Sequence, residues 1–564
     1  MMQTLYFSPS YSLCPECGRK LLFCRRYRRT VKSSSGIFMA VSEKRRCPLH
    51  GIYGSGILES IVSSHCTYAS DVMIESALQM FIKGRSSSEI SQILDTGISD
   101  RHVRRLGSIA LDIFRKIHEE NIPKLREHMK SYILQIDGTT DSEYSMIVVV
   151  RDSVSGFVLH VKRCHSESQE SIEDIMQSIR EKFGMPSGIT CDMRAGIISA
   201  AGNVFPGIPI RICLMHFLRH LGKDLMENLH RDIGVMINRA GIKSPLKSIL
   251  REIPDYYQGT LDEIGHGFCS NPGRMEIMAI RKILEDLLSV NGGSGYGFPF
   301  SMKNLNFFIA CDDAMRKLSH LLPRVKEDES MKYISAITGH LSMITGHLSM
   351  ITGSQVIRET ASRLRDINSL IFQSIRKAFM MPDIGNLSID SKYDPVRDDP
   401  LVRDQCSMVF GELEVYLNAN IEVHMFQAAK LAIDRYQKRE SMLFAQNAAG
   451  TIPRTNNNME IFFRKIRRNV RKRCGNIATG NVLAQSGEAL ALFQNMGSPE
   501  YREMVFGSSD IGSVFARHRK PFGKKEMTRK RRMELADAGT KMILNNTLSS
   551  NPYNEKVWAE AGRA

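Results

Sequence analysis

Three acidic residues lie where a metal-dependent phosphodiesterase would need them. Asp137 and Asp192 each follow a short apolar run typical of a buried strand, and Glu460 stands near the start of an amphipathic segment. Mg²⁺ and Mn²⁺ prefer carboxylate oxygens as ligands. Aspartate also often follows a strand simply because it favours turns. Asp137 and Asp192 therefore indicate a metal site only in combination with Glu460.

The segment around Glu460 adds a second signal. Thr455 or an Asn within 456–458 can cap a helix, which places Glu460 in the first turn. Seven of the ten residues at 464–473 are Lys or Arg, enough to hold a DNA backbone beside the carboxylate. The residues expected to contact DNA from this helix are Arg464, Lys465, Arg467 and Arg468.

Two Cys-Pro-x-(Cys/His)-Gly motifs lie near the start of the chain. Together they predict one tetrahedral structural zinc site with four ligands, Cys14, Cys17, Cys47 and His50. Two unrelated pairs of reduced cysteines are the competing interpretation, and Cys24 or Cys66 could replace His50 as the fourth ligand. The segment around this site would form a zinc ribbon. Ten Lys and Arg residues between positions 19 and 46 would give this ribbon a basic surface that binds phosphates.

Residues 71–118 have the apolar spacing of helices. A helix is predicted at 72–82, a second begins with a capping box at 86–89, and Ser99 caps a third. This spacing is typical of a helix-turn-helix, in which the third predicted helix would be the one that enters the major groove of DNA. The expected DNA contacts on the third helix are Arg101, His102, Arg104 and Arg105. The alternative is an ordinary helical hairpin with a solvated charged face.

From residue 131 the pattern changes to short apolar strands. Three strands, a helix, a strand, a helix and a strand are predicted at 132–136, 144–150, 157–161, 170–183, 187–191, 195–201 and 208–214. This order is that of an RNase H-like core. If the strands ending at Asp137 and Asp192 are neighbours, their carboxylates meet at one edge of the sheet. Residues 220–450 are predicted to be mostly helical.

Four motifs of this chain, in the order in which they occur, resemble those of the DDE transposases of bacterial and archaeal insertion sequences. They are most similar to the Mutator-like group, which carries a helical insertion before its final Glu. The motifs are Asp137-Gly-Thr, Asp192-x-x-x-Gly196, Cys213-Leu-Met-His216 and Thr455-Asn-Asn-x-x-Glu460. Together with the N-terminal motifs, the resemblance covers most of the chain, and its specificity lies in the ordered combination.

The resemblance implies a multidomain α/β chain whose RNase H-like mixed-sheet core is interrupted by a large all-α insertion. Such an insertion accounts for the 268 positions between Asp192 and Glu460. The expected parts are a zinc ribbon at 1–66, a helix-turn-helix region at 67–125, the core at 126–222 and 451–490, the helical insertion at 223–450 and a basic C-terminal tail at 491–564.

The implied activity is metal-dependent cleavage of DNA strands and transfer of the freed 3′ ends. Two Mg²⁺ or Mn²⁺ ions would lie between the carboxylates, with Asp137 bridging both and Asp192 and Glu460 each on one side. The expected partner is double-stranded DNA, both the terminal inverted repeats of the element and the target. Pairing two element ends favours a homo-oligomer. Cys213 and His216 could belong to a second zinc site, although no second ligand pair stands out.

The charge distribution agrees with a polyanionic partner. The 564 residues contain 76 Lys and Arg against 60 Asp and Glu, a net charge of +16. Residues 1–70 carry +7 and residues 454–564 carry +11, so the middle of the chain is nearly neutral at −2. The longest apolar stretch, 198–218, is interrupted by Asn, Pro and Arg, so no membrane partner is expected. Twelve cysteines without a signal peptide favour a reducing, cytoplasmic, nucleoid-associated location.

Two other functions fit part of these observations. A catalytically silent, domesticated DNA-binding regulator would use the zinc ribbon and the helix-turn-helix but not the three carboxylates. An RNase H-like nuclease or resolvase acting on branched nucleic acid would use the carboxylates but not a module that reads element ends. Only an activity measurement separates these classes from a transposase.

Overall fold

The computed structural model shows a mixed α/β chain with 62% helix and two mixed sheets, one of four strands and one of five. The residues that it describes are 2–142, 145–165, 168–253, 272–290, 297–326, 334–381, 393–419, 422–475 and 479–519. They belong to two compact units. The first comprises Met1–Ser187, Ala195–Gly207 and Asn458–Ala564, and the second comprises Gly188–Arg194 and Ile208–Asn457.

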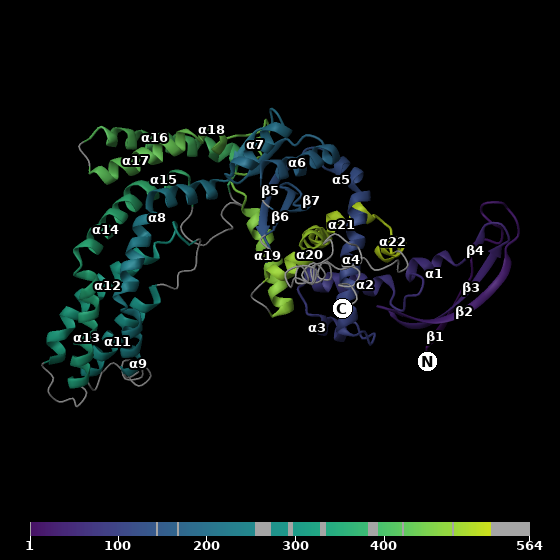
Figure 1. The fold of residues 1–564 in the computed structure, drawn as a ribbon, viewed down its shortest axis with the longest axis horizontal. Helices are drawn as coiled ribbons and strands as arrows, with labels where there is room; N and C mark the ends of the chain where they lie inside the picture. The colour runs from purple at the N-terminus through teal and green to yellow at the C-terminus, as the bar shows by residue number, and fades with distance from the viewer. Residues whose placement is uncertain are drawn as a thin grey trace, which may run out of the picture. The chain divides into compact units, whose positions relative to one another are not determined.

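The first unit begins with the four-stranded sheet (Figure 1). Its strands are β1 (Gln3–Phe7), β2 (Leu22–Ser33), β3 (Gly36–Cys47) and β4 (Gly51–Tyr53). Strand β3 pairs with all three others, parallel to β1 and antiparallel to β2 and β4. One face packs on helix α1 (Gly56–Ile61), and the buried residues between them are Phe7, Val31, Ala40, Leu58, Val62 and Ala69. This apolar core holds the end of β2 and the beginning of β3, next to the turn that joins them.

Three helical segments follow, as the apolar spacing predicts. They are α2 (Ser70–Ala77), which continues as a π-helical turn (Leu78–Ile82), α3 (Ser87–Ile93) and α4 (Asp100–Glu120). Ser86 and Glu89 form the predicted capping box, and the Ser99 side chain accepts a hydrogen bond from the His102 N–H. The capping box thus sets the start of α3 and Ser99 sets the start of α4, on which both α2 and α3 pack.

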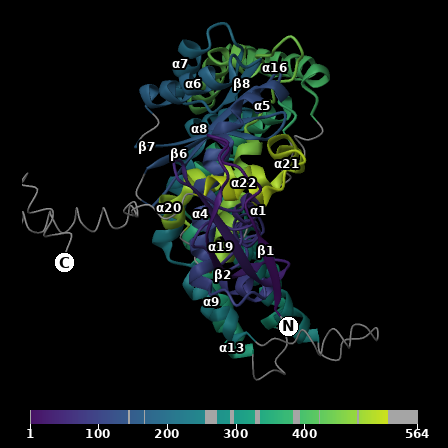
Figure 2. The same cartoon turned by 90° about the vertical axis from the view of Figure 1, so that its right-hand side faces the viewer.

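The first unit also contains the antiparallel strands β5 (Ile133–Thr140), β6 (Met146–Asp152) and β7 (Val158–Cys164). Helices α6 (Gln169–Phe183) and α7 (Ala195–Val204) follow and lie against each other (Figure 2). Strand β5 is longer than predicted, because its pairing with β6 continues three residues past Asp137, as far as Thr140 opposite Met146. Asp137 therefore lies within a paired strand rather than at its end.

The C-terminal part of the first unit is helical, with α19 (Asn457–Cys474), α20 (Gly480–Phe493), α21 (Pro499–Phe506) and α22 (Ile511–His518). Helix α20 packs on α4 and β7, and α22 packs on α1, α2 and α4. The sequence predicted a basic tail from residue 491, whereas residues up to 519 are folded here around the buried rings of Tyr501 and Phe515. Residues 520–564, which hold the rest of that predicted tail, lie outside the described residues.

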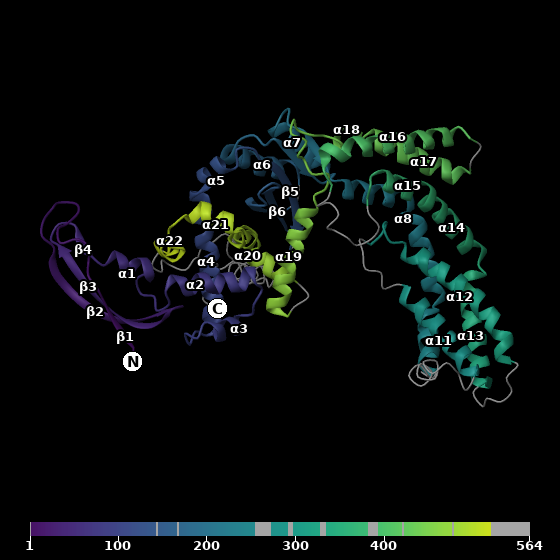
Figure 3. The same cartoon turned by 180° about the vertical axis from the view of Figure 1, so that it is seen from behind.

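The second unit contains the parallel strands β8 (Gly188–Cys191) and β9 (Ile210–Ile212), and is otherwise helical in its described parts. Its helices, several of which are seen in Figure 3, are α8 (Leu214–Ala240), α9 (Lys243–Glu252), α11 (Pro272–Ser289), α12 (Lys303–Lys326), α13 (Ile334–Thr352), α14 (Gln355–Asp366), α15 (Gln373–Ala378), α16 (Pro395–Leu417), α17 (Val423–Gln437) and α18 (Glu440–Leu443). The expectation of a mostly helical region agrees with these elements. Six apolar residues that recur at intervals of three and four in this region are buried, namely Ile357, Ala361, Leu364, Ile367, Ile371 and Ile375.

The order of the elements from β5 to β9 is strand, strand, strand, helix, strand, helix, strand. This is the order that the apolar pattern predicts. Within the described ranges, no helix is both long enough and apolar enough to cross a lipid bilayer.

Candidate metal centre and candidate catalytic carboxylates

The two N-terminal Cys motifs are placed next to each other by the pairing of β3 with β4 and by a tight turn before β2. The Gly18 N–H donates to the Cys14 carbonyl at 2.8 Å, and Gly51 pairs with Cys47 across the β3–β4 turn. Gly18 and Gly51 have φ values of +69° and +101°, which side chains other than glycine rarely adopt. The glycine that ends each motif therefore lets the backbone fold around the sulfur.

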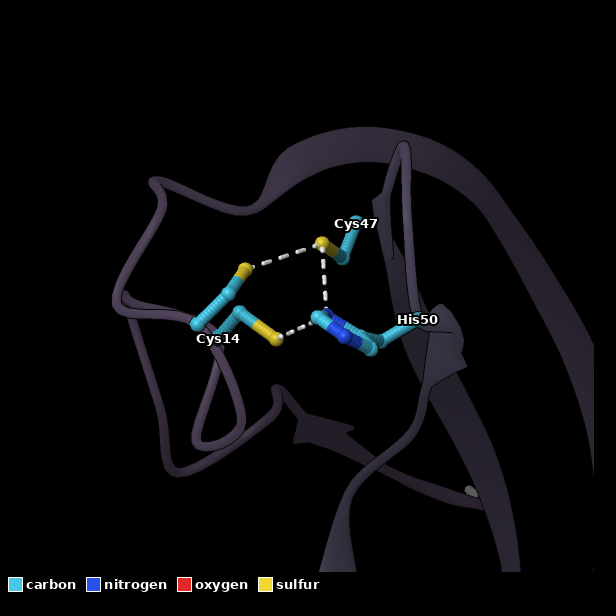
Figure 4. A group of neighbouring side chains, drawn as sticks. Cys14, Cys47 and His50 are labelled. Atoms are coloured by element: carbon cyan, nitrogen blue, oxygen red, sulfur yellow. Dashed lines mark hydrogen bonds between the residues drawn. The ribbon is translucent and has the colours of Figure 1, made fainter.

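The four predicted ligands come together in this turn region. One ligand atom from each residue, Cys14, Cys17, Cys47 and His50, lies within 4.8 Å of every other. The closest approaches are 3.6 Å from Cys14 Sγ to His50 Nδ1, 3.6 Å from Cys17 Sγ to Cys47 Sγ and 3.7 Å from Cys47 Sγ to His50 Nδ1. Figure 4 shows how Cys14, Cys47 and His50 point toward one another. Zn–S bonds of about 2.3 Å and Zn–N bonds of about 2.0 Å put tetrahedral ligand atoms roughly 3.6–3.8 Å apart. These residues could therefore bind a structural metal such as zinc.

The thiols of this cluster differ in acidity. Burial raises the pKa of Cys14, but hydrogen bonds with the Tyr53 hydroxyl and with backbone N–H groups outweigh burial and lower that pKa to about 6. For Cys47, burial also raises the pKa, and hydrogen bonds lower it overall. A backbone N–H lowers the pKa of Cys17, yet burial and the two neighbouring sulfurs raise it overall. Thiolates crowded in this way are stabilised by a bound cation.

Two residues that the motif analysis overlooked orient the ligands. Glu16 Oε2 lies 3.8 Å from His50 Nε2, and the Tyr53 hydroxyl lies 2.8 Å from Glu16 Oε1 and 3.4 Å from Cys14 Sγ. Glu16 thus places a negative charge beside the far ring nitrogen of His50, and the Tyr53 hydroxyl contacts both Glu16 and Cys14. His50 Nδ1 is the atom that faces the sulfurs. Glu16 could have been noticed from its position between Cys14 and Cys17.

The other cysteines considered as substitutes for His50 are placed elsewhere. Cys66 packs against the apolar core between the N-terminal sheet and α1, and Cys24 is not among the four clustered residues. Within the described ranges, the four-residue cluster is the group of His, Cys, Asp and Glu that meets the geometric requirement for a metal site. Cys213 and His216 do not belong to such a group.

Asp192 follows β8 directly, as predicted. Its carboxyl group is buried, with 5% of the residue exposed. Burial raises its pKa, while the Arg194 N–H, which donates to Asp192 Oδ1 at 3.0 Å, and the charge of His220 act in the opposite direction. The Arg194 guanidinium also lies 3.0 Å from Asp192 Oδ2, on a side chain that is 52% exposed. A buried carboxylate of this kind is stabilised by a nearby positive charge.

Asp137 lies in β5 and is partly buried. Its Oδ1 accepts a hydrogen bond from the Gly138 N–H at 2.8 Å. Asp137 and Glu460 belong to the first unit and Asp192 to the second.

Glu460 lies in the first turn of α19, as predicted, and is partly buried. Arg151 in β6 holds this turn, because its Nη1 donates to the Asn458 carbonyl at 3.1 Å and its guanidinium stacks 4.7 Å from the centre of the Phe462 ring. The Nε and Nη2 groups of Arg151 donate to the Gly156 carbonyl at 3.1 and 2.7 Å. Burial lowers the pKa of Arg151 to about 10, so the guanidinium stays charged at neutral pH.

Arg467 joins α19 to the end of β5. Its Nη2 donates to Thr139 Oγ1 at 2.5 Å and to the Thr140 carbonyl at 3.1 Å, and its Nη1 donates to Thr479 Oγ1 at 3.1 Å. Burial lowers its pKa, and the charge of Arg471 lowers it further. Arg467, which lies on the helix that carries Glu460, thus stabilises the strand that carries Asp137. Sequence reasoning had placed it among the DNA contacts.

The other predicted DNA contacts divide by exposure. Arg464, Lys465 and Arg468 are exposed on α19. On α4, the exposed residues are Arg101, Arg104 and Arg105. His102 is partly buried, and its ring lies 4.8 Å from the ring of Tyr68. Both helices therefore present a basic face, although not with every residue that the sequence suggested.

In the second unit, Cys213 positions the segment that leads into α19. It is the N-cap residue of α8, and its Sγ accepts a hydrogen bond from the Asn456 N–H at 3.2 Å. The Leu214 N–H donates to the Arg454 carbonyl at 2.9 Å. His216 lies in the first turn of α8, and burial lowers its pKa to about 4. This motif therefore orders the chain just before Glu460.

The chain was also compared with known proteins. No model of a known protein family matches it, and no curated protein has a significantly similar sequence.

Proposed function

We propose that this protein is a DNA transposase of the DDE type, which binds terminal inverted repeats, cleaves DNA strands and transfers the 3′ ends to a target. The observation that carries the proposal is the order of elements and acids. Asp137 lies in β5, Asp192 directly follows β8, and Glu460 lies in the first turn of a basic helix. The resemblance of the four ordered motifs supports the same assignment.

The three acids offer the hard oxygen ligands that Mg²⁺ and Mn²⁺ require. When bound, two such ions would supply a Lewis acid for the attacking and leaving oxygens of the phosphodiester. Asp137, Asp192 and Glu460 would hold these ions. Burial raises the pKa of Asp192, so its charged form needs a positive charge nearby, which Arg194 supplies here and a bound metal ion would also supply.

Three basic surfaces of the first unit would hold DNA. The N-terminal sheet, stabilised by zinc, and the exposed face of α4 would recognise the element ends. Arg464, Lys465 and Arg468 on α19 are exposed within two turns of Glu460, so they would hold the backbone near the cut phosphate. Because a transposition event joins two element ends, we expect at least two copies of the chain on the paired ends.

The direct test uses the purified full chain and DNA that flanks its gene. We expect specific binding to imperfect inverted repeats there, Mg²⁺- or Mn²⁺-dependent cleavage at their ends, and joining of the 3′ ends to a second duplex. Specific binding without cleavage under any divalent metal would instead favour a regulator. Cleavage of branched DNA without any requirement for the repeats would favour a resolvase.

Arg151 offers a prediction about the third acid. Replacing Arg151 with Met removes the hydrogen bond to the Asn458 carbonyl and the stacking on Phe462, so the first turn of α19 loses its anchor on β6. Because a misplaced ligand weakens metal binding, we expect the Mg²⁺ concentration for half-maximal cleavage to rise by about tenfold. The measurement is cleavage rate against Mg²⁺ and against Mn²⁺, which tolerates poorer geometry.

The control for this prediction is Arg316→Met, which removes an exposed Arg that pairs within its own helix. Arg151→Lys should lie between wild type and Arg151→Met, since it keeps the charge but loses the multiple hydrogen bonds. An equal loss of rate at all metal concentrations would show that Arg151 serves folding only.

A further inference from the structure

A small cavity lies in the first unit, beside the N-terminal end of α4. Its walls come from residues 65–68, from the first three turns of α4 and from Arg519, the residue after α22. The cavity encloses about 170 Å³. Figure 1 shows α22 lying beside α4 and α1, as the packing of these helices requires. A segment near the C-terminus of the chain thus closes a cavity on the helix predicted to read DNA.

The cavity is positively charged. Arg105 and Arg519 contribute to its wall, and none of its lining residues is acidic. Burial and the charges of these two arginines lower the pKa of His102, so its ring is a neutral hydrogen-bond donor there. Burial lowers the pKa of Arg519; the neighbouring Cys66 acts in the opposite direction, and the charge of Arg105 lowers the pKa further. The Nη1 atom of Arg519 is buried and has no hydrogen-bond partner. A buried guanidinium with an unmet donor is costly unless an anion binds it.

The walls of this cavity are held in place by hydrogen bonds and stacking. The guanidinium of Arg29 donates to the carbonyls of Val62, Ser63 and Cys66, at 3.1 to 3.3 Å, and so fixes the segment that precedes the cavity. The His102 ring lies 4.8 Å from the Tyr68 ring. On the strand side, Lys32 Nζ lies 5.6 Å from the centre of the same Tyr68 ring. The wall formed by residues 65–68 and His102 is therefore held in place before any ligand binds.

We propose that this cavity binds one phosphate group of the DNA backbone, held by Arg519, Arg105 and His102. A volume of 170 Å³ is that of roughly five or six water molecules in the liquid. It lies below the roughly 300 Å³ at which pockets for drug-sized ligands begin, so it fits a single phosphate better than a nucleotide. The proposal rests on the proposed function in that DNA supplies the phosphate.

The site gives the C-terminal part of the chain a role in DNA binding. Arg519 comes from the region of positive charge at the C-terminus, and Arg105 comes from the N-terminal helices. A phosphate bound between them would tie both regions to one DNA strand. Phosphate contacts fix the register of a protein on the duplex without reading the sequence, so the site would set how α4 enters the groove.

The test measures DNA binding by the full chain as a function of salt, without any cleavage. For Arg519→Gln we expect binding of element-end duplex to weaken about tenfold near 0.15 M salt, and the slope of log affinity against log salt to fall by about 0.9. His102→Gln is expected to weaken binding in the same direction. The matched control is Arg517→Gln, because Arg517 lies two residues away and is exposed on α22.

The outcomes separate this site from the proposed function. Loss of DNA affinity in Arg519→Gln but not in Arg517→Gln supports the site, even if the wild-type protein cleaves no DNA. Equal affinities and equal salt slopes for the two variants would overturn it, as would a wild-type chain that binds no DNA. A second arm measures thermal stabilisation by inorganic phosphate. If Arg519→Gln loses that stabilisation but keeps full DNA affinity, the site takes free phosphate and the assignment to DNA is wrong.

Discussion

Replacing Asp137 with Asn will abolish Mg²⁺-dependent DNA cleavage, by at least about a thousandfold, while leaving specific DNA binding within about twofold of wild type. Asn offers one neutral oxygen in place of a charged carboxylate, and metal ions in such sites supply several kcal/mol of transition-state stabilisation. Each 1.4 kcal/mol or so corresponds to about a tenfold change in rate. The measurement is single-turnover cleavage and strand transfer on labelled element ends, beside a binding titration on the same DNA.

The same assay on Asp192→Asn and Glu460→Gln tests whether the three acids act as one unit. If they hold one pair of ions, each single replacement will cost nearly as much as any two together, since residues acting together are strongly non-additive. Asp313→Asn is the matched control, because Asp313 pairs with Lys317 on the surface of α12 at 2.7 Å and its side chain is 43% exposed. Strand transfer that survives in Asp137→Asn would refute the DDE assignment.

The second large effect concerns the metal cluster. Replacing both Cys14 and Cys17 with Ser will reduce bound zinc from about one ion per chain to near zero, because two of four ligands are lost. The strands around this turn have little apolar core of their own, formed by Cys14, Leu21 and Cys47 with Tyr53 packed beside them. We therefore expect the ends of β2 and β3 near residues 22 and 47 to lose protection from hydrogen exchange, and DNA affinity to fall at least about tenfold.

Metal content is measured on the purified full chain by elemental analysis, and local order by hydrogen exchange of β2, β3 and β4. The control is Cys24→Ser with Cys474→Ser, which removes two thiols outside the cluster. Full zinc content in Cys14→Ser/Cys17→Ser would exclude the site. Loss of zinc with unchanged DNA affinity would support the metal site but show that the N-terminal sheet does not contribute to DNA recognition.

Much of the fold follows from local sequence signals. The capping box of Ser86 and Glu89, the cap at Ser99 and the alternation of strands and helices from β5 to β9 all rest on residues close together in the chain. Strand ends are less well determined, because the extent of β5 depends on how long its pairing with β6 continues. The positive charge of residues 491–564 predicts a tail, whereas residues 499–518 form two helices. Apolar residues at helical spacing, such as Tyr501, Val505 and Phe515, are the local signal for these helices.

The sequence by itself determined three ligands of the metal cluster, Cys14, Cys17 and Cys47, and the element on or beside which each candidate acid lies. Each Cys motif is two ligands and a glycine within five residues, so its geometry is local. Only the tertiary structure decided that His50, rather than Cys24 or Cys66, completes the cluster. That choice depends on the pairing of β3 with β4, which joins His50 to Cys47.

Tertiary structure also decided what the basic residues do. In the sequence, Arg464, Arg467 and Arg468 are equivalent members of one basic run. Helical periodicity turns Arg467 towards Thr139, 328 positions away, and leaves the other two exposed. Arg151 acquires its role in the same way, from Asn458, which lies 307 positions away. The sequence therefore shows which residues are charged. Their partners depend on long-range packing, which no local sequence pattern predicts.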